Sequence, residues 1–159
     1  MDNNRYQPPK SGFDKSPRNR EPGSLLKAVL FGAATDIGGT LVIQIVIGVV
    51  YGIMLASQGM SEAQMKEAFE NIAPGSVVWL FLITFGLIMS GVAGFVCART
   101  ANVVSYNALG IVSAISVAYG TYMGRGDYDW PALLLLNMLG LCAIFIGGWW
   151  YIRRLAPRS

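Results

Sequence analysis

The longest apolar segment of the chain is residues 24–57, SLLKAVLFGAATDIGGTLVIQIVIGVVYGIMLAS, and it carries the acidic residue Asp36. As a helix it would measure ~50 Å, against a bilayer hydrocarbon core of ~30 Å. The segment is therefore long enough to cross a membrane, and it must tilt, protrude or break. The Gly38-Gly39 pair is the expected weak point. If the helix breaks there, its first section lies partly at the membrane interface.

Three more apolar segments follow, at about 76–98, 101–123 and 130–152. The whole chain is 53% hydrophobic and only 13% charged, whereas soluble domains carry roughly 25% charged residues. Because each segment is long enough to span a bilayer as a helix, the sequence predicts an all-α, polytopic integral membrane protein. Its membrane domain is predicted to be a four-helix transmembrane bundle over residues 24–153.

The segments outside the expected spans are polar. Residues 1–23 hold four prolines, five basic residues and almost no aliphatic side chains, which predicts a disordered cytoplasmic tail. Residues 154–159 are expected to form a cytoplasmic C-terminus. The first connection has a capping-box pattern, Ser61 with Gln64, and predicts a short amphipathic helix over about 61–72. That helix would lie on the membrane surface or across the mouth of the bundle, as part of an ordinary structured loop or, alternatively, as a gating lid.

Basic residues are concentrated on one side of the expected membrane domain. The tail, the turn at Arg99 and the C-terminus with Arg153-Arg154 are basic, while the opposite loops are mainly acidic. The positive-inside rule therefore places the N- and C-termini in the cytoplasm. The basic charge is explained by topology and by attraction to anionic lipid. No basic patch with interleaved aromatic residues lies on a folded element, so nucleic acid is not an expected partner.

The polar, proline-containing lead, the glycine-rich spans and the short turns are similar to those of small four-span proteins of bacterial inner membranes. This resemblance implies a multi-pass protein of the cell inner (plasma) membrane that is surrounded by the lipid bilayer. It carries no particular function over to this chain.

Small residues recur at four-residue intervals along the expected spans, which keeps them on one side of each helix. Such faces let helix backbones approach closely where lipid offers no hydrophobic drive for association. We therefore expect tight packing within the bundle, with a contact in a homo-oligomer or with other membrane subunits as the alternative. The candidate helix-packing residues are Gly32, Gly48, Gly52, Gly86, Ser90, Gly94, Gly110, Gly140 and Gly147.

Asp36 is the single acidic residue inside the four apolar segments. A carboxylate in hydrocarbon is costly, so it normally faces protein or water and often marks a working site. One interpretation is structural, with hydrogen bonds or an ion pair with Arg99 holding the carboxylate ionised. The other interpretation is ion or proton handling near mid-membrane. The candidate buried polar site comprises Asp36, Thr40, Gln44, Arg99, Asn102, Tyr106 and Asn107.

The sequence shows no pattern for catalysis, a cofactor or a metal. It has no histidine, no second buried carboxylate for acid–base chemistry, no glycine-rich phosphate loop and no metal-ligand spacing. We therefore expect a non-enzymatic membrane protein that acts by helix–helix association, as a homo-oligomer or as a subunit of an envelope complex. The alternative is a small channel or transporter with Asp36 in an ion or proton path.

Overall fold

The computed structural model describes residues 23–101, 106–126 and 128–155, and in these ranges the regular structure is helical, with no strand. Most of the predicted tail, together with residues 156–159, lies outside the described residues. The elements are α1 (Leu25–Ala33), the π-helical turn η2 (Ala34–Gly38), α2 (Gly39–Ser57), α3 (Glu62–Glu70), α4 (Val77–Ala101), α5 (Tyr106–Gly124) and α6 (Trp130–Leu155). The prediction of an all-α fold is confirmed.

Three helices in the described residues are long and apolar enough to cross a membrane: Leu25–Ser57, Val77–Ala101 and Trp130–Arg154. They correspond to the first, second and fourth expected spans. The helix α5 is not among them, because polar side chains such as Asn107 and Tyr119 lower its mean hydropathy. The four-span arrangement therefore stays a prediction.

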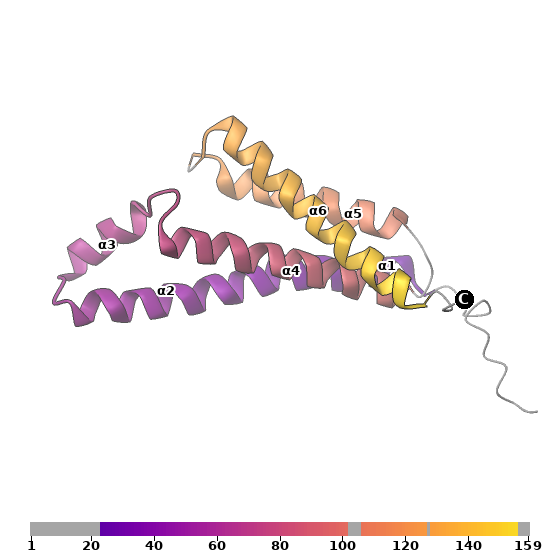
Figure 1. Cartoon of the computed structure of the whole chain (residues 1–159), viewed down its shortest axis with the longest axis horizontal. Coiled ribbons are helices and arrows are strands. Elements are labelled where there is room, and N and C mark those ends of the chain that lie inside the picture. Colours follow the sequence, from indigo (N-terminus) through magenta and orange to yellow (C-terminus); the bar gives the residue numbers. More distant parts are fainter. Residues whose placement is uncertain (1–22, 102–105, 127, 156–159) are drawn as a thin grey trace, which may run out of the picture.

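The first long helix does not break at Gly38-Gly39. The elements α1, η2 and α2 follow one another without interruption, and both glycines keep right-handed helical angles, with φ of −65° and −63°. The irregularity is the π-helical turn η2, which widens the helix around Asp36. The far end of α2 extends past α4, α5 and α6 and lies beside α3 (Figure 1).

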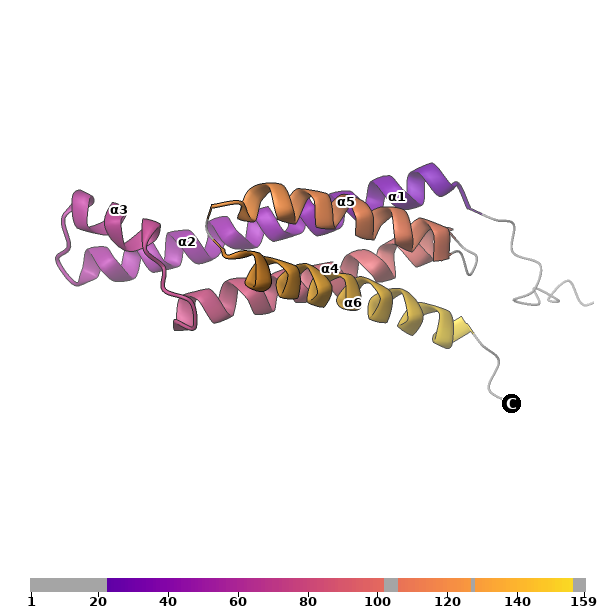
Figure 2. The ribbon, with the colours of Figure 1, turned by 90° about the horizontal axis from the view of Figure 1, so that it is seen from above.

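The helices are packed at one end of the molecule and spread at the other. Where α1 begins and α6 ends, the helices lie together, whereas the α5–α6 hairpin diverges from α2 and α4 toward the opposite end (Figure 1). Seen from above, α5 lies along the first long helix and α6 crosses α4 (Figure 2). The packed end contains a hydrophobic core drawn from α1, α4, α5 and α6. Its buried residues are Ala28, Cys97, Ala101, Ala108, Leu109, Val112 and Ile144. The molecule is thus closed at one end and open at the other.

The backbones of α4 and α6 touch at glycines. A Cβ atom added to Gly94 would collide with the backbone carbonyl of Ile144, and one added to Gly147 would collide with that of Gly91. On α1, a Cβ atom on Gly32 would lie only 2.9 Å from a side chain of α5. These glycines permit the close approach of helices that small residues typically provide in membrane proteins.

The helix α3 lies against α2. The predicted capping box is present, with the Ser61 backbone N–H donating to Gln64 Oε1 over 2.9 Å. The ring of Phe69 lies over Gly48 and Gly52, 4.0 and 3.6 Å from where their Cβ atoms would be. These two glycines therefore accommodate the loop helix rather than another long helix.

Three other candidate packing residues, Gly86, Gly110 and Gly140, make no close contact with a neighbouring helix. A Cβ atom on any of them would meet nothing within 4 Å. Gly86 and Gly140 border a cavity between the helices, and Gly110 lies on the exposed surface of α5. Their small size therefore leaves open space instead of a helix contact.

Gly147→Ala is expected to lower the stability of the folded bundle. The added methyl group overlaps the Gly91 carbonyl, and overpacking of this kind typically costs about 1–3 kcal/mol. Gly110→Ala is the matched control, because its methyl group meets open space. Thermal unfolding in detergent, followed by circular dichroism, should show a lower midpoint for Gly147→Ala alone. Equal midpoints for the two variants would contradict the backbone contact.

Candidate functional site

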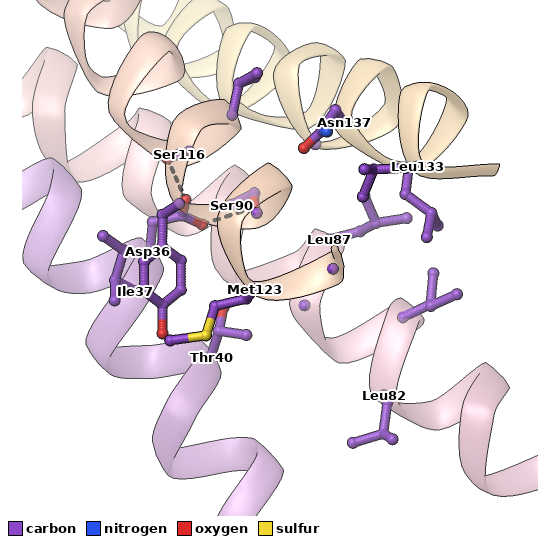
Figure 3. A pocket seen from close by; sticks show the side chains of 18 of the residues that line it. Asp36, Ile37, Thr40, Leu82, Leu87, Ser90, Ser116, Met123, Leu133 and Asn137 are labelled. Carbon is purple, nitrogen blue, oxygen red and sulfur yellow. Dashed lines mark hydrogen bonds between the residues drawn. The ribbon is translucent and has the colours of Figure 1, made fainter. Parts of the chain in front are cut away.

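Asp36 lies within η2 and is only 7% exposed. Its carboxylate accepts a hydrogen bond from the Ser90 hydroxyl on α4, over 2.7 Å, and another from the Ser116 hydroxyl on α5 (Figure 3). Each carboxylate oxygen thus accepts one of these bonds. One acidic side chain therefore joins three helical segments that are distant in the sequence.

The glycine at position 39 allows α4 to approach the first long helix closely enough for Ser90 to reach Asp36. Gly39 faces the Met89 side chain, which occupies the space that a Cβ atom at position 39 would need. Ser90 is the next residue on α4, and its hydroxyl reaches the carboxylate. π-Helical turns are rare and occur frequently at functional sites. The π-helical turn and the missing side chain at Gly39 together position the carboxylate between α4 and α5.

A cavity of about 460 Å³ extends from Asp36 between α2, α4, α5 and α6. It runs toward the open end of the molecule, where Leu133 in the first turn of α6 borders it. Figure 3 shows Asp36 with Ser90 and Ser116 on one side, and Asn137 with Leu133 on the other. The lining is mainly apolar. Its polar side chains are Asp36, Thr40, Gln44, Ser90, Ser116, Tyr119, Tyr128 and Asn137.

A second polar contact joins α5 and α6 beside this cavity. Asn137 Nδ2 on α6 donates to Thr121 Oγ1 on α5 over 3.0 Å. A Cβ atom on Gly120 would lie 2.9 Å from Asn137 Oδ1, so the missing side chain at that position makes room for the amide. The two helices of the diverging hairpin are therefore tied together near the open end.

Within the part of the chain that the structure describes, no cationic side chain pairs with Asp36. The ion pair found there joins Lys66 to Glu70 on the exposed surface of α3, over 3.8 Å. The described residues also contain no group of three or more His, Cys, Asp or Glu side chains that could hold a metal. A carboxylate offers about four acceptor positions, so Asp36 keeps acceptor capacity beyond its two serine bonds.

Three of the seven candidate polar-site residues line this cavity, namely Asp36, Thr40 and Gln44. Four-residue spacing keeps them on one side of the helix. These three polar residues of the first long helix therefore face the cavity, and exposed aliphatic residues of α2 such as Val42 and Ile45 do not line it.

The partners expected for the carboxylate are not at its depth in the bundle. Arg99 is exposed in the last turn of α4, and Tyr106 and Asn107 are exposed at the start of α5. Asn102 lies outside the described residues. Arg99 follows Ser90 by nine residues, or ~13 Å along the helix axis. The carboxylate accepts hydrogen bonds from serines deeper in the bundle, in place of the ion pair with Arg99 or the hydrogen bonds from Tyr106 and Asn107 that were expected.

Ser90 and Ser116 were not expected as the partners of Asp36, although the sequence holds a signal for one of them. Asp36 follows the basic residue Lys27 by nine residues, and Ser90 precedes the basic residue Arg99 by nine. Both basic residues lie near the packed end of the molecule. Each of the two side chains therefore lies nine residues, or ~13 Å along its helix, from a basic residue at the packed end. This equal spacing is the sequence signal that Asp36 and Ser90 lie at the same level.

Comparison of the chain with protein-family models, characterised proteins and solved structures finds no match. The fold and the site alone therefore define the class of protein. It is an all-helical protein with three helices that are long and apolar enough to cross a membrane, and with a buried carboxylate at one end of a large cavity.

Ser116→Ala is expected to destabilise the fold, because one oxygen of a buried carboxylate loses its donor. Hydrogen bonds to charged groups contribute about 1.5–3 kcal/mol. Ser57→Ala is the control, since the Ser57 hydroxyl donates to the Met54 carbonyl of its own helix at an exposed position. Unfolding in mixed micelles should show a reduced free energy of unfolding for Ser116→Ala and little change for Ser57→Ala. Native stability of Ser116→Ala would argue against this hydrogen bond.

Proposed function

We propose that the chain is an integral membrane protein of the inner (plasma) membrane, with α5 as the fourth crossing of a transmembrane bundle. The length and apolar character of three helices support insertion. The helix α5 contributes Ala108, Leu109 and Val112 to the core that it shares with α1, α4 and α6. In the membrane, α5 would therefore pack against more apolar helices, which would shield its polar side chains from lipid.

The basic end of the bundle supports a cytoplasmic location for both termini. Arg153 and Arg154 lie in the last turn of α6, over the rings of Trp149 and Trp150 at 5.0 and 4.1 Å from the ring centroids. Tryptophan is enriched at membrane–water interfaces, and basic residues are enriched on the cytoplasmic side. In this orientation, the Asp36 cavity opens toward the opposite side of the membrane.

The Asp36 cavity is proposed as the working site, where a small cation binds as part of its transport across the membrane. The observation that carries this proposal is the buried Asp36 carboxylate, which has no cationic partner among the described residues and lies at a cavity. Ionisable groups are expensive within a membrane and commonly mark ion and substrate pathways. A positively charged ligand would supply the missing counter-charge.

The cavity volume favours a small organic cation or a hydrated ion over a bare ion. About 460 Å³ falls within the range of roughly 300–1,000 Å³ that is typical of small-molecule sites. A mainly apolar lining with a few convergent polar groups is also typical of such sites. Because the hydrophobic core fills the other end of the bundle, the geometry fits a carrier that changes conformation better than an open channel.

Asp36→Asn is expected to reduce cation uptake strongly and to keep the fold, because the amide retains the shape of the carboxylate without its charge. In proteoliposomes, uptake of labelled tetramethylammonium or of protons should fall about tenfold or more, equivalent to ~1.4 kcal/mol. Asp129→Asn is the matched control, since Asp129 is exposed before α6 and does not line the cavity.

Two outcomes would overturn the transport proposal. One is native protein that moves neither probe faster than empty liposomes. The other is native uptake by the Asp36→Asn variant, which would show that the negative charge is not used.

A second candidate function, association with another copy or with another membrane subunit, is favoured by one face of α5. Gly110, Ala114 and Ala118 are exposed at four-residue spacing on this face, and none of them lines the Asp36 cavity. Small-residue faces of this kind pack helices together in membranes. An oligomer formed through α5 would therefore be compatible with cation binding at Asp36.

Ala114→Cys, introduced together with Cys142→Ser to remove an exposed thiol, is expected to give a covalent dimer in native membranes with a bismaleimide crosslinker. Ile45→Cys in the same background is the control, because Ile45 is also exposed but belongs to α2 and not to the α5 face. Gel electrophoresis measures the dimer fraction. Similar dimer fractions for the two variants would argue against association through α5.

A further inference from the structure

A second cavity, a groove on the surface of α4 and α6, is lined only by apolar and aromatic residues and glycine. Its volume is about 460 Å³. The walls are formed by Ile88, Val92 and Phe95 from α4 and by Ala143, Ile146 and Trp150 from α6. Several of these side chains are large and exposed. We call this surface the α4–α6 groove.

The α4–α6 groove exists because glycines lie between its walls. The backbones of the two helices touch at Gly91 and Gly147, and both residues line the groove. No side chain therefore fills the space above the crossing. The indole N–H of Trp150 is the one polar group on a lining side chain, so an occupant of the groove must be apolar over most of its length.

One end of the α4–α6 groove is cationic. The Arg154 guanidinium lies over the ring of Trp150, 4.1 Å from its centroid, and Trp150 itself lines the groove. Arg153 is the neighbouring residue and is also exposed. Among the described residues, the acidic side chains other than Asp36 lie on α3 or directly before α6, away from this end. Arg153 lies over Trp149, which does not line the groove, so Arg154 is the arginine placed to meet an anionic group there.

We propose that the α4–α6 groove binds an anionic glycerophospholipid, with one acyl chain in the groove and the phosphate at Arg154. The inference rests on the proposed membrane insertion, but it is independent of cation transport at Asp36. An acyl chain satisfies the apolar lining, and the phosphate complements the cationic end. Trp150 lines the groove and lies under the Arg154 guanidinium, so it connects the acyl-chain site to the phosphate site. Aromatic residues are enriched at the membrane–water interface, where these two parts of a lipid meet.

The charge at the end of the groove favours a lipid chain over a helix of a second protein. The apolar lining ends at Trp150, under the Arg154 guanidinium, so the occupant must combine a narrow apolar part with an anionic group. A single extended hydrocarbon chain with a phosphate headgroup has this arrangement and can follow the groove along its length.

The test is native mass spectrometry of the full chain, purified in detergent and mixed with phosphatidylglycerol or phosphatidylcholine of identical acyl chains. The native protein is expected to retain one phosphatidylglycerol in preference to phosphatidylcholine. Arg154→Gln should weaken retention of phosphatidylglycerol about fivefold, the effect of one cationic side chain near an anionic lipid. Arg125→Gln, which removes an exposed arginine at the other end of the bundle, should leave it unchanged.

A second pair of variants tests the apolar part of the site. Val92→Trp places a large ring in the groove and should reduce retention of both lipids. Val46→Trp makes the same change at an exposed position of α2 that does not line the groove, and it should have no effect. If Val92→Trp does not fold, Ile146→Trp fills the groove from the α6 side.

Three outcomes would overturn the lipid site: equal retention of the two lipids by native protein, unchanged retention with the groove filled, or a dimer held through Val92 that lipid does not displace. The proposals remain distinguishable. Release of the protein from membranes by alkaline carbonate would overturn membrane insertion itself. Native protein that moves neither transport probe but retains phosphatidylglycerol would overturn cation transport and leave this lipid site intact.

Discussion

The backbone contact between α4 and α6, at Gly91, Gly94 and Gly147, is the constraint on which the rest of the structure depends. The α5–α6 hairpin is positioned by this contact, and the Asp36 cavity forms where the hairpin faces α2 and α4. On another face of the same crossing, the absence of side chains at the glycines leaves the apolar α4–α6 groove. Two candidate sites of different chemistry therefore arise from a single close approach of two helices.

The carboxylate of Asp36 ties the first long helix to this arrangement. Ser90 directly precedes Gly91, so the α4 residue that donates to the carboxylate lies beside the helix crossing. Ser116 adds α5 to the same contact. The hydrophobic core closes one side of this point, and the cavity opens on the other. The structural role of this buried acceptor group and the cation binding proposed for it therefore depend on the same position.

Much of the fold could be predicted from the sequence, because its signals are local. The apolar segments predicted the long helices, and the capping box of Ser61 and Gln64 predicted the start of α3. The partners of Asp36 could not be predicted in this way. Several polar residues of the third segment were equally suitable donors by type, and the choice of Ser116 depends on how α5 rotates and slides against the first long helix.

By itself, the sequence determined the helical fold and the apolar length of the helices, because hydropathy and helix capping depend on neighbours along the chain. It also singled out Asp36, since no other acidic residue lies in an apolar segment. Only the tertiary structure decided that Gly94 and Gly147 touch another backbone whereas Gly86 and Gly140 border open space. The physical reason is that glycines are alike in the sequence and differ only in what the fold places opposite them.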